Sequence, residues 1–178
     1  MSRYIALFES LRIGSKRLAM AELRAAFEAE GCSNLETVVA GGNILFDHPE
    51  RPDDGLEEML ARLMRARFGM SSAVLVRSPR TLEAAIASNP FASEGEEDFV
   101  HTLFVDGSVD PAAFAHMQAG RQGAEQIAMG DRALHIDYVS GAAEAKQVGA
   151  FIERRLGLRG TARSLRSMKR MLAKMVEA

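Results

Sequence analysis

The sequence predicts an α+β fold built from two similar halves and a basic C-terminal helix. Short apolar runs of strand length alternate with longer stretches of helical period, in the order β-α-β-β-α-β. Most of that order begins again in the second half of the chain. This order is typical of the ferredoxin-like unit. The composition fits an ordered globular protein, because 47% of the 178 residues are hydrophobic and 26% are charged.

The first half is expected to contain four strands and two helices. The predicted elements are a strand at 3–9, a loop at 10–17, a helix at 18–30, strands at 35–40 and 44–46, a helix at 56–68 and a strand at 72–77. Each strand is a short apolar run. Gly41-Gly42-Asn43 is the turn signal that joins the middle two strands into a hairpin. In both helices apolar residues recur every three or four positions, and Gly31 and Gly69 follow them as stop signals.

The second half repeats the order of elements without its last strand. Ser78-Pro79 begins a connecting helix that runs to 87, with serine as the cap and proline in the first turn. The elements that follow are an acidic loop to 98, a strand at 99–105, a helix at 110–119, strands at 124–129 and 132–139, a helix at 142–156 and a final helix at 164–176. No closing strand is visible, so this half is expected as βαββα.

Four segments are expected along the chain. They are a ferredoxin-like half at 1–78, a helix with an acidic connector at 79–98, a second ferredoxin-like half at 99–157 and a basic C-terminal helix at 158–178.

Several function classes find no support in the sequence. It contains no phosphate-loop, dinucleotide-binding, nucleophile-elbow or zinc-protease motif, and its four histidines lack the spacing of metal ligands. No cofactor and no metal are therefore expected. Cys32, the one cysteine, is expected to be buried and unreactive. No apolar stretch is long enough to span a membrane, so no membrane partner and a cytoplasmic location are expected.

The loop at 10–17 is the first candidate binding site. Gly14 permits an unusual backbone conformation, and Lys16 and Arg17 come just before a helix start, where backbone N–H groups and the helix dipole favour anions. The alternative interpretation is a solvated loop. Asn43, in the hairpin turn, is a second candidate, and its alternative role is to stabilise that turn.

The C-terminal segment is the third candidate site. Residues 153–178 carry a net charge of +6, against −8 for the rest of the chain. Arg163, Arg166 and Lys169 are its candidate anion-binding residues, and such asymmetry is typical of proteins that contact nucleic acid or an acidic partner. The alternative is that these cations pair with the acidic loops at 53–58 and 94–98.

Several blocks of sequence together resemble a bacterial family of unknown function, DUF 1697. These blocks are Tyr-Ile-Ala-Leu-Phe at 4–8, Ile-Gly-Ser-Lys at 13–16, Gly-Gly-Asn-Ile-Leu-Phe at 41–46, Val-Leu-Val-Arg-Ser at 74–78, Asn-Pro-Phe at 89–91 and Thr-Ala-Arg-Ser at 161–164. The resemblance spans nearly the whole chain. It implies ferredoxin-like α+β halves and names no established biochemical activity.

The chain departs from the pattern of this family at the glycine loop. Gly14 and Lys16 match the usual loop of the family that the chain resembles. Glu9, Ser10 and Arg12 stand where that family usually has arginine, glycine and asparagine. In the C-terminal block Thr161, Arg163 and Lys169 match, whereas Ser164 replaces the usual asparagine. If the family shares an anion site, Glu9 reverses the charge at its edge.

Three functions follow as hypotheses. The leading one is a binding or regulatory module for an anionic ligand, either a phosphorylated small molecule or a nucleic acid. The first alternative is an enzyme, with Glu9, Asp47, His48 and His135 as candidate acid or base groups. Glu9 is the first choice among them, because it ends a strand beside the glycine loop. The second alternative is a structural protein that associates with itself as a homo-oligomer.

Overall fold

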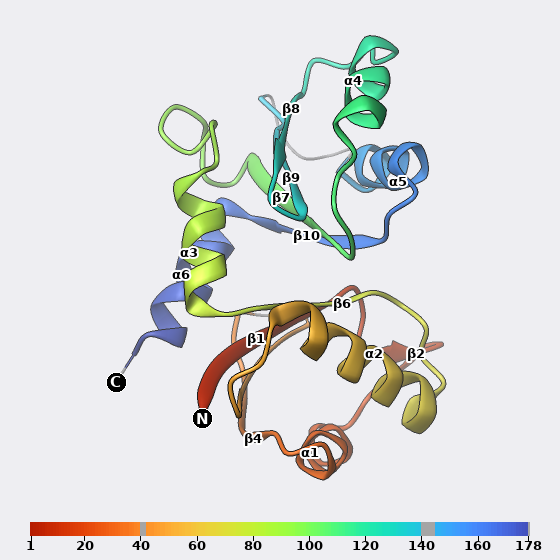
Figure 1. The fold of residues 1–178 in the computed structure, drawn as a ribbon, viewed down its shortest axis with the longest axis vertical. Coiled ribbons are helices and arrows are strands. Elements are labelled where there is room, and N and C mark those ends of the chain that lie inside the picture. Colours follow the sequence, from red (N-terminus) through yellow and green to blue (C-terminus); the bar gives the residue numbers. More distant parts are fainter. Residues whose placement is uncertain (40–41, 140–144, 178) are drawn as a thin grey trace. The chain divides into compact units, whose positions relative to one another are not determined.

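The computed structural model describes residues 1–39, 42–139 and 145–177, and it confirms the mixed α+β class (Figure 1). These residues form six helices and three antiparallel sheets. The strands are β1 (Ser2–Phe8), β2 (Arg12–Ile13), β3 (Lys16–Arg17), β4 (Ser33–Thr37), β5 (Asn43–His48), β6 (Val74–Arg77), β7 (Val100–Val105), β8 (Gln126–Gly130), β9 (Ala133–Asp137) and β10 (Gly160–Ser164). The helices are α1 (Met20–Ala29), α2 (Asp53–Phe68), α3 (Pro79–Ala87), α4 (Pro111–Ala119), α5 (Ala145–Leu156) and α6 (Leu165–Met175). Within the described ranges, no helix is long and apolar enough to cross a membrane.

The chain divides into two compact units. Unit 1 comprises Met1–Thr81 and Met171–Ala178, and unit 2 comprises Leu82–Arg170. Each unit contains one four-stranded sheet and two helices that pack on it.

In unit 1 the strands lie in the order β4-β5-β1-β6, and every neighbouring pair is antiparallel. Tyr4, Ala6 and Phe8 alternate along β1 toward one face of the sheet, as the two-residue period of a strand requires. They share a core with Phe27 of α1 and Leu60 of α2, so these two helices cover the same face. The apolar spacing that predicted both helices is the stripe that packs on the sheet.

In unit 2 the strands lie in the order β10-β7-β9-β8, again antiparallel throughout. Leu103 on β7 and Leu134 on β9 share a core with Met117 of α4 and Ile152 of α5. Asp110 caps α4, because its carboxylate accepts a hydrogen bond from the Ala112 N–H at 3.3 Å.

The βαββα order predicted for the second half is wrong, because β10 closes this half as a fourth strand. The segment from Gly160 to Ser164 pairs along its whole length with β7, from Gly160 opposite Val105 to Ser164 opposite His101. It lacks an apolar run, and its strand conformation comes from the hydrogen bonds of this pairing rather than from local propensity. The expected segment 158–178 is therefore a strand followed by a helix.

Two further predictions in unit 1 are corrected. The expected loop at 10–17 contains the hairpin of β2 and β3, and α1 begins at Met20 rather than at 18. Gly14 has φ +62, which suits the first central position of a two-residue hairpin turn, where glycine is favoured. Gly41 of the expected turn, and 142–144 of the expected helix at 142–156, lie outside the described residues.

Candidate anion-binding surface

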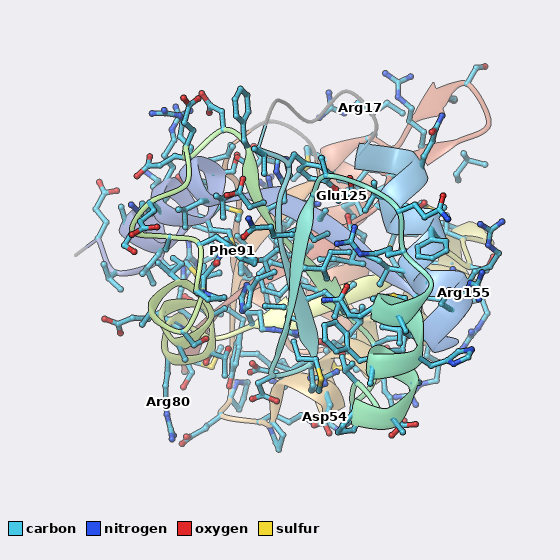
Figure 2. The ribbon with its side chains drawn as sticks, turned by 90° about the horizontal axis from the view of Figure 1, so that it is seen from above. Arg17, Asp54, Arg80, Phe91, Glu125 and Arg155 are labelled. Carbon is cyan, nitrogen blue, oxygen red and sulfur yellow. The ribbon has the colours of Figure 1, made fainter. Side chains whose placement is uncertain are left out.

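The small hairpin of residues 12–17, which we call the basic hairpin, is the predicted site whose cations have the fewest carboxylate partners among the described residues. All six residues from Arg12 to Arg17 are exposed (β2 is labelled in Figure 1 and Arg17 in Figure 2). Arg12 lies directly opposite Arg17 in the register, and Ile13 lies opposite Lys16. Two arginines therefore share one face of a two-stranded ribbon.

No described carboxylate forms an ion pair with Arg12, Lys16 or Arg17. The recorded contacts of Arg12 stay inside the loop: its Nη1 donates to the Ser15 carbonyl oxygen at 3.2 Å, and its backbone N–H donates to Ser10 Oγ at 3.2 Å. Like charges placed directly opposite each other across two strands are destabilising. An anion that binds both arginines would remove that repulsion.

Lys16 and Arg17 do not sit at the start of a helix, which corrects the expected geometry of this site. They form β3, and Leu18 and Ala19 separate them from α1. Ala19 caps α1 without a side-chain hydrogen bond. The hairpin turn at Gly14 pairs the cations with β2 instead, so the surface depends on side-chain charge rather than on the helix dipole.

Asn43 stabilises the turn between β4 and β5, which was the alternative to a role in binding. Asn43 is 2% exposed, and its Nδ2 donates to the Val39 carbonyl oxygen at 2.7 Å. Its own carbonyl oxygen accepts a hydrogen bond from the Val38 N–H at 3.2 Å. Asn43 thus ties together the two arms that lead into the turn.

The C-terminal cations pair with the acidic connector. Arg166 Nε lies 2.7 Å from Asp98 Oδ1, and Lys169 Nζ lies 2.5 Å from Glu97 Oε1. Lys169 lowers the pKa of Glu97 through this hydrogen bond, and Asp98 raises the pKa of Arg166 in the same way. The pairing with the loop at 94–98, which the sequence left as an alternative, is therefore confirmed for these two cations.

Arg163 is engaged inside unit 2. Its Nη1 donates to Thr161 Oγ1 at 2.7 Å and to the Ala162 carbonyl oxygen at 2.8 Å, and burial lowers the pKa of its guanidinium to about 10. Lys16 belongs to unit 1 and Arg163 to unit 2, so the basic hairpin is a candidate site that does not include Arg163.

The residues proposed for an enzyme do not come together. Glu9 is exposed and lines neither of the two hollows described below. The His135 ring is buried, where its Nδ1 lies 2.9 Å from Thr102 Oγ1, and burial lowers its pKa to about 4. His48 Nδ1 lies 2.9 Å from the Pro49 carbonyl oxygen. Among the described residues, no group of three or more potential ligands could hold a metal ion.

Two surface hollows were missed by sequence reasoning, because their residues come from separate segments. A hollow of about 500 Å³ in unit 1 is lined by Arg3, Asp47, Glu36 and Lys174, among others. Its charges pair with one another: Arg3 lies 3.2 Å from Asp47, and Glu36 bridges Arg3 and Lys174. A second hollow, of about 230 Å³ in unit 2, lies against Phe151. Neither presents an uncompensated charge as the basic hairpin does.

Comparisons with known proteins agree on the family and the fold. A family model described as "Protein of unknown function (DUF1697)" matches residues 1–135, which confirms the resemblance seen in the sequence. The chain is similar to the conserved bacterial protein SP0830 from Streptococcus pneumoniae, with 18% identity over 99% of both chains and a TM-score of 0.74. At this identity the likeness shows the fold alone. No curated protein matches the chain.

Proposed function

The chain belongs to the DUF1697 family, and we propose that it is a binding module for a phosphate-bearing anion, which it holds on the basic hairpin. The observation that carries the proposal is the set of three exposed cations, Arg12, Lys16 and Arg17, with no carboxylate partner on the described part of the chain. Arginine and lysine are the residues that proteins use to bind phosphate oxygens.

The proposed site keeps three of the residues expected from the sequence, Gly14, Lys16 and Arg17. Gly14 forms the turn and the two cations supply charge. Arg12 joins them because it lies opposite Arg17. The other expected residues are left out, since each is engaged elsewhere: Asn43, Arg163, Arg166 and Lys169.

We also propose that each unit is a ferredoxin-like half. In unit 1 the order β6-β1-β5-β4 places the four strands of the sheet, counted along the chain, as fourth, first, third and second. In unit 2 the order β10-β7-β9-β8 follows the same scheme. A βαββαβ order with this sheet, repeated in the two units, supports ferredoxin-like halves. It supports the expected first half at 1–78, and it extends the expected second half, 99–157, through β10 to 164.

The test compares the wild-type chain with Arg12→Glu/Lys16→Glu/Arg17→Glu by fluorescence anisotropy. The probes are a labelled 20-base-pair DNA duplex and a labelled nucleoside triphosphate, at 50 and 200 mM salt. Three cation–phosphate contacts predict a slope of about −2.7 in log affinity against log salt, which is about a 40-fold loss over this range. The triple variant is expected to lose at least 100-fold in affinity at 50 mM salt.

The matched control is Arg24→Glu/Arg62→Glu/Arg80→Glu. These three arginines are exposed on α1, α2 and α3, so the net charge changes by the same amount without touching the hairpin. It is expected to retain most of the wild-type affinity. Equal losses in the two triple variants would show that only net charge matters, and no binding of either probe by the wild type would overturn the proposal.

A further inference from the structure

The basic hairpin carries an apolar side chain that the binding of phosphate does not explain. Ile13 is 46% exposed, although it stands among charged and polar neighbours. It is the last residue before the Gly14–Ser15 turn, so it lies next to the tip of the hairpin. Ile13 shares its face of the ribbon with Lys16, and the two arginines occupy the other face.

We infer that the occupant of the basic hairpin is duplex DNA, entered from the minor groove with Ile13 as an apolar wedge between base pairs. This inference rests on the proposed function, because the cations must first hold the phosphates. Proteins that enter the minor groove use arginine and lysine beside it, and they insert isoleucine, leucine or similar side chains between base steps. The hairpin presents both kinds of residue within six positions.

The open shape of the hairpin favours a polyanion over a small phosphorylated ligand. Small ligands bind in hollows that bury most of their surface. All six residues of the hairpin are exposed, and none of them lines either described hollow. A small ligand would therefore be held from one side, whereas the two backbones of a duplex provide phosphates on both sides of a groove.

The dimensions explain why insertion would bend the duplex. The two backbones of an antiparallel ribbon lie about 4.8 Å apart before side chains are counted. The minor groove is about 6 Å wide, so the ribbon fits only where the groove opens. An apolar wedge opens it by unstacking a base step, and steps such as TA unstack most readily.

A single apolar side chain also argues against a lipid surface as the occupant. Ile13 is the one apolar residue of the hairpin, whereas even a whole myristoyl chain, which buries far more apolar surface, gives only marginal membrane binding. Anionic vesicles therefore belong in the test as a competing outcome. A duplex needs only one wedge, because phosphate contacts supply most of the affinity.

The experiment measures base unstacking and binding separately. The probe is a 20-base-pair duplex with 2-aminopurine placed at each TA step in turn, and anisotropy of a labelled copy reports affinity. The wild type is expected to raise the 2-aminopurine fluorescence at one or more steps. Ile13→Ser is expected to bind within about 10-fold of the wild type with the same salt slope, and to leave the fluorescence unchanged. Val176→Ser, which removes another exposed apolar side chain, is expected to behave as the wild type does.

The outcomes separate this inference from the proposed function. Binding of the duplex without any rise in fluorescence, or an equal rise with Ile13→Ser, would overturn the wedge and leave phosphate binding intact. Binding to vesicles that contain 30% phosphatidylserine, with no binding to the duplex, would overturn DNA as the occupant. Failure of the wild type to bind any of these anions would overturn the proposed function itself.

Discussion

Replacing Glu57 by leucine is expected to destabilise the protein more than any surface change, because it removes a carboxylate that pairs with a buried guanidinium. Glu57 on α2 is 6% exposed, and Arg77 at the end of β6 is 4% exposed. Glu57 Oε2 accepts hydrogen bonds from Arg77 Nη1 at 2.7 Å and from the Val76 N–H at 3.0 Å. A single carboxylate oxygen of Glu57 therefore pairs with the Arg77 guanidinium and also accepts a backbone hydrogen bond from β6.

The magnitude follows from the burial of both partners. Removing one member of a buried ion pair costs about 3–5 kcal/mol, because the remaining charge stays out of water and loses the attraction of its partner. Domains of ordinary stability have about 5–15 kcal/mol in total. With a urea slope of about 2 kcal/mol per M, Glu57→Leu is expected to lower the unfolding midpoint by about 2 M.

Urea unfolding followed by circular dichroism tests this, with two matched variants. Glu58→Leu makes the same change at the next, exposed position of α2 and is expected to shift the midpoint only slightly. Glu57→Leu/Arg77→Leu removes both charges and is expected to cost less than Glu57→Leu alone. A cost below 1 kcal/mol for Glu57→Leu, or a double variant less stable than the single one, would refute the reasoning.

Three further predictions concern buried and capping groups. Burial lowers the pKa of His135 from 6.5 to about 4, so between these pH values the unfolded chain binds a proton at this position and the folded chain does not. The free energy of unfolding should therefore rise by about 3 kcal/mol from pH 4 to pH 6.5. If the urea midpoint of His135→Gln changes with pH as steeply as that of the wild type, this prediction is contradicted. Ser78→Ala should cost about 1 kcal/mol in thermal unfolding, because Ser78 Oγ accepts the Thr81 N–H at 3.1 Å; an unchanged Tm would contradict it. Burial raises the pKa of Cys32 to about 12, so a thiol reagent at pH 8 should react within minutes only after urea is added; rapid labelling of the folded chain would show that the thiol is accessible.

The sequence could predict the elements whose signal is local. The stripe of α2 spans four turns and ends at Gly69, which has φ +66 as a left-handed cap should. The sequence also predicted the N-cap at Ser78, since a serine directly before a proline that starts a helix is typically the N-cap residue. Such elements need no knowledge of distant parts of the chain.

The elements that the sequence did not predict are strands that depend on hydrogen bonding to a partner strand. Each strand of the basic hairpin has two residues, too few for any alternation of apolar and polar side chains to be seen. β10 has no apolar run, and it forms a strand because its backbone hydrogen-bonds to the edge of β7. Local composition carries no signal for either case, whereas the register of the sheet defines both.

The candidate site was predicted in part for the same reason. Gly14, Lys16 and Arg17 were found as a glycine loop with cations, but the contribution of Arg12 depends on its position opposite Arg17. From the sequence, the pairing of Arg166 with the loop at 94–98 was only an alternative, because Asp98 lies 68 positions away along the chain. Charge counted along a segment does not show which charges are already paired.

The most direct measurement is the affinity of the wild-type chain for a 20-base-pair duplex as a function of salt, beside Arg12→Glu/Lys16→Glu/Arg17→Glu. Binding through the basic hairpin predicts a slope of about −2.7 for the wild type and at least 100-fold weaker binding by the variant. Wild-type binding with a slope near zero, or an unchanged affinity in the variant, would contradict the assignment of the hairpin as the anion-binding surface.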